Sequence, residues 1–164
     1  MTRFGIEIDA ESTRQSLRSL RNEWETDSVF ITGTNADYAV YLEYGRGPIE
    51  AQDAEALRFE NQDGDVIYRA SVDGHEPYPF FRPALREFDA NPETFIIDNT
   101  GYTTLQEIPN GDELIRAIAV ALENQIKANA SAESATDRSP GTHPSHPKRD
   151  TGNLVASIQS IKIQ

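Results

Sequence analysis

The chain has 164 residues, a formal net charge of −12 and no cysteine. This length predicts one domain, with or without extensions, and the lack of cysteine excludes disulfides and thiolate metal sites. No apolar run is long enough to span a bilayer and no signal peptide opens the chain, so we expect a soluble protein that stays in the cell or in a particle assembled there.

The first part of the chain predicts a strand, a helix and a second strand. Apolar residues alternate with others from Arg3 to Asp9, which is typical of a half-buried strand. The apolar run within Ser28–Thr32 predicts a short buried strand, and Gly33–Thr34 predicts a turn after it. Between them, Asp9 caps a predicted helix whose apolar stripe consists of Ala10, Thr13, Leu17, Leu20 and Trp24.

The stretch Asn35–Gly47 predicts a short aromatic helix with both ends marked. Asn35 is a good N-cap, and Asp37 adds negative charge near the positive end of the helix dipole. Gly45 ends the helix because glycine adopts a left-handed backbone at little cost. The residues at helical spacing between these ends are Tyr38, Tyr41 and Leu42.

The middle of the chain predicts a hairpin and a proline-rich segment. Leu57–Glu60 and Val66–Arg69 flank Asp63–Gly64, which is a strong hairpin turn signal. In Pro77–Leu85 the prolines favour an extended chain that leads into a helix, since proline suits a first helical turn. The apolar run within Thr94–Asp98 predicts a further strand.

The last third predicts a long helix, a polar segment and a helix–strand tail. Residues 129–149 are rich in Ala, Ser, Thr, Pro and Gly, so we interpret them as a polar linker or mobile loop. Residues 1–128 and 150–164 then form a single domain, in which the two terminal strands share one sheet. Asn110 and Glu113 have the spacing of a capping box, and the helix behind them has an apolar face made of Ile115, Ile118, Ala119, Leu122 and Ile126.

Familiar catalytic motifs are missing from the sequence. It has no glycine-rich phosphate loop, no His-Glu metalloprotease helix and no nucleophile elbow. The three histidines, His75, His143 and His146, lie beside proline or glycine in predicted loops, which is a poor setting for a positioned base. Glu43 is the carboxylate on the aromatic helix, and we expect it to pair with an arginine such as Arg46 or Arg82, either within the chain or across a subunit contact. We therefore expect neither an enzyme nor a cofactor.

The acidic composition favours an origin at high salt. The chain has only three lysines, and its acidic residues are spread along its length. At molar salt the Debye length is only ~3 Å, so repulsion among surface carboxylates is screened. Tight binding along a phosphate backbone would need clusters of Lys and Arg, which are missing from the sequence.

Lowering the salt concentration should therefore destabilise the isolated protein through carboxylate repulsion. Thermal melting followed by circular dichroism between dilute and molar salt tests this expectation. A melting temperature that does not change with salt would remove the argument for a salt-loving host.

Three separated segments resemble one protein family. Tyr38–Gly45 resembles the Tyr-Ala-x-Tyr-Val-Glu-Phe-Gly helix of the neck and tail-completion proteins, the head–tail connectors of long-tailed, siphovirus-like viruses. Pro79–Leu85 resembles their Pro-Phe-Leu-Arg-Pro-Ala-Leu segment, and Asp150–Ile158 resembles their Asp-Thr-Gly-x-Leu-x-x-Ser-Ile segment. In that family the last segment normally comes first, so the motif order here looks circularly permuted. Termini that meet in one sheet would allow such a permutation.

The resemblance implies an α+β fold, with a small twisted, mostly antiparallel sheet and helices packed on one side. It implies a ring, usually a hexamer, at the junction between the DNA-filled head and the tail of a virion. A head-side connector or stopper protein and a tail terminator or tail tube protein would be its partners, without any membrane. Double-stranded DNA would pass through an acidic lumen without specific binding. Together with the composition, the resemblance indicates a virus of a halophilic archaeon.

The resemblance also implies which residues meet the neighbouring subunits. Ring subunits make head-to-tail contacts that close by rotation, and aromatic residues and arginine are enriched in interface cores. The aromatic helix and the proline-rich segment suit such an interface. The candidate interface residues are Tyr38, Tyr41, Glu43, Tyr44, Arg46, Phe80, Phe81, Arg82, Asp150 and Leu154.

Two alternatives stay open at this point. The chain could be another virion part, either a tail terminator or a minor capsid protein. The alternative from a different class is a small metal- or ligand-binding module, with His143, His146 and nearby acidic residues as the site. The prolines around these histidines oppose the helix that would place both on one metal ion, so we expect no bound metal.

Overall fold

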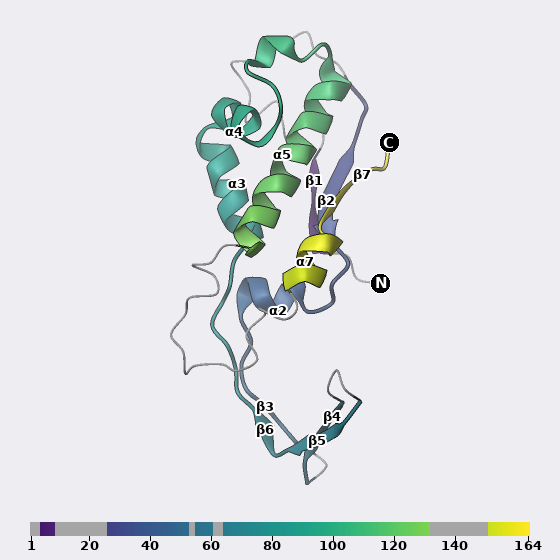
Figure 1. Cartoon of the computed structure of the whole chain (residues 1–164), viewed down its shortest axis with the longest axis vertical. Coiled ribbons are helices and arrows are strands. Elements are labelled where there is room, and N and C mark those ends of the chain that lie inside the picture. Colours follow the sequence, from purple (N-terminus) through teal and green to yellow (C-terminus); the bar gives the residue numbers. More distant parts are fainter. Residues whose placement is uncertain (1–3, 9–25, 53–54, 61–63, 132–150) are drawn as a thin grey trace.

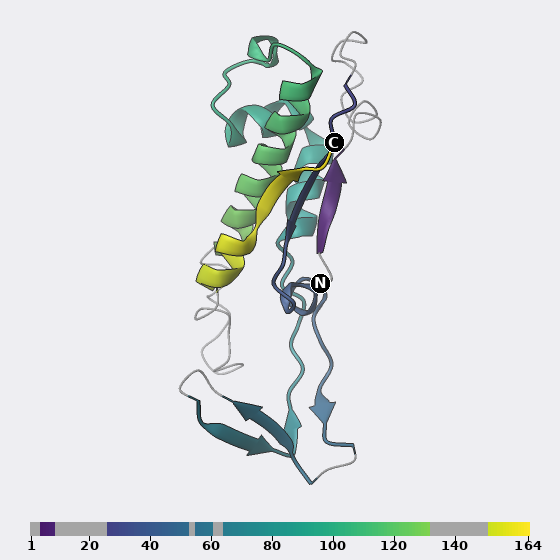
Figure 2. The same cartoon turned by 90° about the vertical axis from the view of Figure 1, so that its right-hand side faces the viewer.

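The computed structural model of the chain has an α+β fold, as predicted (Figure 1). A long helix, α5 (Gly111–Ser131), lies between an antiparallel sheet on one side and the helices α3 (Phe81–Ala90) and α4 (Pro92–Asn99) on the other (Figure 2). The predicted helix after Asp9 lies outside the described residues. The structure describes residues 4–8, 26–52, 55–60, 64–131 and 151–164.

The sheet of the body has the strand order β1-β2-β7, with both neighbouring pairs antiparallel. These strands are β1 (Phe4–Ile8), β2 (Phe30–Thr34) and β7 (Gln159–Lys162). The second strand was predicted two residues too early, and its supposed turn at Gly33–Thr34 is wrong. Gly33 is held inside the sheet, because it pairs with Gly5 on one side and Gln159 on the other.

The terminal strands share one sheet, as predicted, but they do not meet. β2 lies between them and is antiparallel to both, so β1 and β7 run in the same direction. β1 therefore begins at one end of the sheet and β7 ends at the other (Figure 1). A direct link between termini, which a simple circular permutation needs, would have to run along the length of the sheet.

The hydrophobic core surrounds α5. The face predicted from the sequence is fully buried, and Leu114, Ala117 and Ala121 are buried as well. The burial extends around this helix because it is covered by the sheet on one side and by α3 and α4 on the other. Phe88 of α3 and Phe95 of α4 close the outer layer edge to face, with ring centroids 5.7 Å apart.

The strand predicted at Thr94–Asp98 is wrong, because this segment is helix α4. Asn91 caps the helix by accepting a hydrogen bond from the Thr94 amide, and Pro92 occupies the first turn. Phe95 and Ile96 point into the core, where they pack against α5. The local cap and the packing on α5 thus override the strand-like run of apolar residues.

The aromatic helix is shorter than predicted. It spans α2 (Ala39–Tyr44) with Tyr38 as its N-cap, so the predictions that Asn35 caps it and that Asp37 lies in its first turn are wrong. The hydroxyl of Thr34 accepts the Ala36 amide at 3.1 Å, which forms a turn before the helix. Gly45 ends the helix as predicted, with a positive φ of 77°.

The C-terminal elements differ in one boundary from the prediction. α5 continues to Ser131, so the polar linker cannot begin at residue 129, and residues 132–150 lie outside the described part. The predicted short helix is α7 (Thr151–Ser157), and it packs on α5. A 3-10 turn, η1 (Leu105–Glu107), precedes α5.

Within the described residues, the helices are either too short or too polar to cross a membrane.

The described residues between 46 and 76 form an arm that extends from the body (Figures 1 and 2). Its lower part pairs β3 (Ile49–Glu50) with β6 (Ser71–Val72), and its tip is the predicted hairpin of β4 (Leu57–Glu60) and β5 (Val66–Arg69). Arg46 and His75 pair at its base. Gly74 is required there, since a Cβ atom at this position would lie 2.5 Å from the Arg46 carbonyl oxygen.

Candidate interface site

The carboxylate of Glu43 is completely buried and binds the start of α3. Its Oε2 atom accepts the backbone amides of Phe80 at 2.8 Å and Phe81 at 3.0 Å. Its Oε1 atom accepts the backbone amide of Arg82 at 3.0 Å. A negative charge at the N-terminus of a helix satisfies amides that have no partner within the helix. Glu43 of α2 therefore caps α3 from a distant part of the sequence.

The side chain of Arg82 completes this arrangement. Its Nε donates to Glu43 Oε1 at 2.9 Å, and its Nη2 donates to the Glu43 carbonyl oxygen at 2.6 Å. The prediction that Glu43 pairs with an arginine is confirmed, and the partner is Arg82 rather than Arg46. Arg82 also lies over the ring of Tyr44, with its Cζ atom 4.9 Å from the ring centroid.

Further backbone contacts hold the same region. Tyr78 donates its amide to the carbonyl oxygen of Leu42 at 2.6 Å, which joins the end of α2 to the proline-rich segment. Asn129 of α5 donates to the carbonyl oxygen of Phe80 at 3.1 Å. Asn129 was assigned to the linker from the sequence, but here it positions the start of α3.

Above this anchor, α2 presents an aromatic surface. Val40 is 39% exposed, Tyr41 53% and Tyr44 54%. We call these three residues the α2 patch. Ala39 and Glu43 on the opposite side of the helix are fully buried. The helix therefore has one side fixed in the core and the other side available for contact.

The structure divides the predicted interface residues into three groups. Tyr41, Tyr44 and part of Arg82 lie together at the surface, and Tyr38 is half-buried against the core. Arg46 lies at the base of the arm, where its Nη2 donates to the Asp73 carbonyl oxygen at 3.4 Å. Asp150 lies outside the described residues.

The third group is buried in the chain's own core, which overturns its assignment to an intersubunit surface. Glu43 and Phe80 are 0% exposed, and Phe81 and Leu154 are each 2% exposed. The rings of Phe80 and Phe81 pack on each other with centroids 5.0 Å apart. Both belong to the buried core cluster with residues of α2, α3 and α5, so their apolar area is already removed from water.

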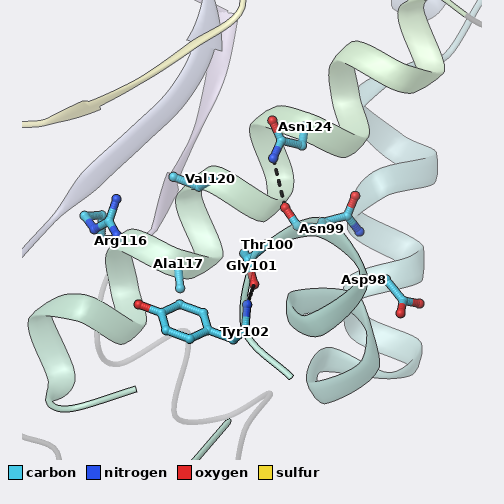
Figure 3. Close-up of a pocket in the computed structure, with 9 residues that line it drawn as sticks. All are labelled: Asp98, Asn99, Thr100, Gly101, Tyr102, Arg116, Ala117, Val120 and Asn124. Carbon is cyan, nitrogen blue, oxygen red and sulfur yellow. Dashed lines mark hydrogen bonds between the residues drawn. The ribbon is translucent and has the colours of Figure 1, made fainter. Parts of the chain in front are cut away.

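A separate open hollow lies where α4 ends beside α5 (Figure 3). Asp98 and the following residues to Tyr102 form one wall, and Arg116, Val120 and Asn124 of α5 form part of the other. Asn124 donates to the carbonyl oxygen of Asn99 at 2.8 Å and thus ties the walls together. The lining includes neither histidine nor lysine.

A polar cluster beside this hollow fixes the first turn of α5. Glu113 binds Arg116 in the same helix, and the hydroxyl of Tyr102 donates to Glu113 at 2.6 Å. Arg116 and Tyr102 together lower the pKa of Glu113 from 4.5 to about 2, and the bond to Glu113 raises the pKa of Tyr102. Asn110 accepts the amide of Glu113 at 2.9 Å, which confirms the Asn110 half of the predicted capping box, while the Glu113 side chain binds Arg116 and Tyr102 instead.

This cluster predicts a loss of stability in acid. A carboxyl group whose pKa is lowered on folding stabilises the protein fully above its unfolded pKa of 4.5, and this contribution disappears as the pH falls toward 2. Glu113→Gln should therefore lower the free energy of unfolding near pH 7, and its difference from the wild type should shrink near pH 3. Urea unfolding at both pH values measures this. A difference that does not depend on pH would contradict the assigned role.

The predicted metal-binding alternative gains no site in the described part of the chain. His143 and His146 lie outside the described residues. Among the residues that are described, no group of three or more His, Asp or Glu side chains is close enough to hold a metal ion.

No protein-family model matches the chain, and no curated protein or solved structure matches it either.

One surface feature escaped the interpretation of the sequence. The hairpin at the arm tip exposes Val66, Ile67 and Tyr68, although the sequence predicted only the hairpin and no surface for contact on it. The signal in the sequence was the apolar run Val66–Tyr68 on a predicted two-stranded hairpin, because the flanking sequence predicts no further strand that could cover it.

Proposed function

We propose that this chain is a structural subunit of the neck of a long-tailed virus. Copies of it form a ring, with six subunits as the expected number, which joins the DNA-filled head to the tail. Its partners are a head-side connector or stopper protein and a tail terminator or tail tube protein. DNA passes through the lumen of the ring without specific binding, because the strongly acidic subunit repels phosphate.

The contact between Glu43 and the start of α3 carries this proposal. It joins two of the three segments on which the family resemblance rests, since Glu43 belongs to the aromatic helix and Phe80, Phe81 and Arg82 belong to the proline-rich segment. Leu154 of the third segment lies in the same core cluster. The resembling residues thus form one structural unit, which is what a shared fold would require of them.

The α2 patch supports an assembly role. It places Val40, Tyr41 and Tyr44 side by side on a short helix whose position is fixed by the buried carboxylate beneath it. Rigid, exposed aromatic residues next to an arginine are typical of the centre of protein interfaces. A neighbouring subunit or a neck partner could bury this surface without rearranging the helix.

Electron microscopy of particles assembled without this chain tests the proposal. We expect separate DNA-filled heads and free tails, and complementation with the wild-type chain should restore joined particles. Complementation with Tyr41→Ala, Tyr44→Ala should restore fewer joined particles than Glu93→Ala, which changes an exposed residue on α4. Normally joined particles in the absence of the chain would refute the proposal.

The position of the chain in the particle provides a second test. A gold label on the chain should lie at the head–tail junction. A label confined to the capsid shell would favour a minor capsid protein, and a label that stays with free tails after they separate from heads would favour a tail terminator.

A further inference from the structure

The arm ends in a ribbon that the body does not support. β4 and β5 pair only with each other among the described strands, and they lie at the far end of the arm (Figures 1 and 2). Val66 is 41% exposed, Ile67 38% and Tyr68 65%. An isolated two-stranded hairpin is at best marginally stable in water. This ribbon therefore needs a surface that covers it.

One face of the ribbon combines apolar groups with a positive charge. Leu57 lies directly opposite Arg69, and Ile67 is two residues from Arg69 along the strand. Because side chains alternate between the faces of a strand, these three residues share one face. Ile67 and Arg69 are exposed and Leu57 is half-buried. We call Leu57, Ile67 and Arg69 the arm face.

The sheet of the body has one side turned away from α5. The hydroxyl of Ser160 donates to the Ala119 carbonyl oxygen of α5 at 2.9 Å, so Ser160 points toward the helix. The next residue, Ile161, therefore points away from α5. Ile161 lies opposite Ile31, which lies opposite Glu7, and this row crosses all three strands.

This side of the sheet is apolar, exposed and negatively charged. Ile161 is 43% exposed and Ile163 is 52% exposed, while Glu7 is exposed and Ile31 is half-buried. β7 pairs with β2 along one edge, and its other edge has no partner among the described strands. An open edge of this kind readily accepts another strand. We call Glu7, Ile31, Ile161 and Ile163 the outer sheet face.

We infer that the arm face of one copy docks on the outer sheet face of a second copy of this chain. Arg69 then meets Glu7 of the second copy, and Ile67 meets its Ile161. Two observations identify a second copy as the occupant. Arg69 on the arm face and Glu7 on the outer sheet face carry opposite charges, so these two positions complement each other. The arm also extends away from its own sheet, so it cannot cover that sheet itself (Figure 2).

The geometry of this contact is head-to-tail. Different surfaces of the two copies meet, so each copy can bind one neighbour through its arm and another through its sheet. Such contacts close into a ring when the rotation between copies permits it. The inference thus rests on the self-association in the proposed function and specifies which surfaces carry it.

Cysteine cross-linking tests the contact directly, because the natural chain has no cysteine. Ile67→Cys combined with Ile161→Cys should give, on oxidation, a ladder of dimers and larger species on a non-reducing gel. Ile67→Cys combined with Glu93→Cys is the matched control, since Glu93 is exposed on α4, away from the proposed contact, and should give no such ladder. Equal ladders, or a ladder from the control alone, would overturn the inference.

A charge exchange provides an independent test. At about 0.1 M salt, where the Debye length is ~10 Å, Arg69→Glu alone and Glu7→Arg alone should each weaken self-association about tenfold, as measured by analytical ultracentrifugation. The double variant Arg69→Glu, Glu7→Arg should recover most of the wild-type association. Single variants with no effect, or a double variant weaker than both, would overturn the contact.

These results can be separated from the fate of the proposed function. Rings that persist when the arm contact is broken would overturn the inference and leave the neck role intact. A confirmed arm contact in a chain whose loss still gives joined particles would refute the neck role and leave the contact intact.

Discussion

Glu43→Ala is expected to lower the free energy of unfolding by at least about 3 kcal/mol. The substitution removes the acceptor from the buried amides of Phe80 and Phe81, and each buried N–H left without an acceptor costs about 1–3 kcal/mol. The amide of Arg82 and its Nε lose their partner as well. Urea unfolding followed by far-UV circular dichroism gives the change, provided that the m-value is unchanged.

Two further variants show which property of Glu43 matters. Glu43→Gln keeps the shape but replaces one acceptor oxygen with a donor that faces backbone N–H groups, so we expect a loss nearly as large as in Glu43→Ala. Glu87→Ala, an exposed change on the same helix α3, should stay within about 0.5 kcal/mol of the wild type. Equal stabilities for Glu43→Ala and Glu87→Ala would show that the buried carboxylate does not fix α3.

Phe80→Ala is expected to cost about 3–5 kcal/mol of stability in the isolated chain, because it opens a cavity in a filled core. Phe80 is completely buried and packs on Phe81. Tyr41→Ala should change the stability of the isolated chain by no more than about 0.5 kcal/mol, since Tyr41 is 53% exposed. The same urea experiment on both variants gives the two values.

Tyr41→Ala and Phe80→Ala should also differ in how they affect assembly. Tyr41→Ala should weaken self-association or partner binding while the fold stays intact. Phe80→Ala should affect assembly only through the lost stability, so an added stabilising osmolyte should restore it. If Phe80→Ala left stability unchanged and weakened assembly, then Phe80 would belong to an interface after all.

Local signals in the sequence were sufficient for several elements. The Asp63–Gly64 turn predicted the hairpin of β4 and β5, and Gly64 has the positive φ of 85° that such a turn favours. Asn110 predicted the start of α5, and the helical period predicted the α5 face that is buried. These features depend on residues within one or two turns of each other, so sequence alone contains them.

The error at α4 arose from weighing one local signal above another. Three consecutive apolar residues in Thr94–Asp98 favoured a strand, while Asn91 and Pro92 already marked a helix start. The spacing of apolar residues alone cannot distinguish a short buried strand from a short buried helix. The cap was therefore the better evidence, and the structure agrees with it.

The sequence by itself determined the hairpin and the long helix, and it predicted an arginine partner for Glu43; the α+β class followed from the family resemblance. Only the tertiary structure decided that this arginine is Arg82, that Phe80 and Phe81 belong to the core, and that the arm tip remains uncovered. The reason is physical: an aromatic residue has the same local pattern in a core and in an interface. Its role depends on which distant elements meet around it, and here a buried carboxylate on α2 brings α3 against α5.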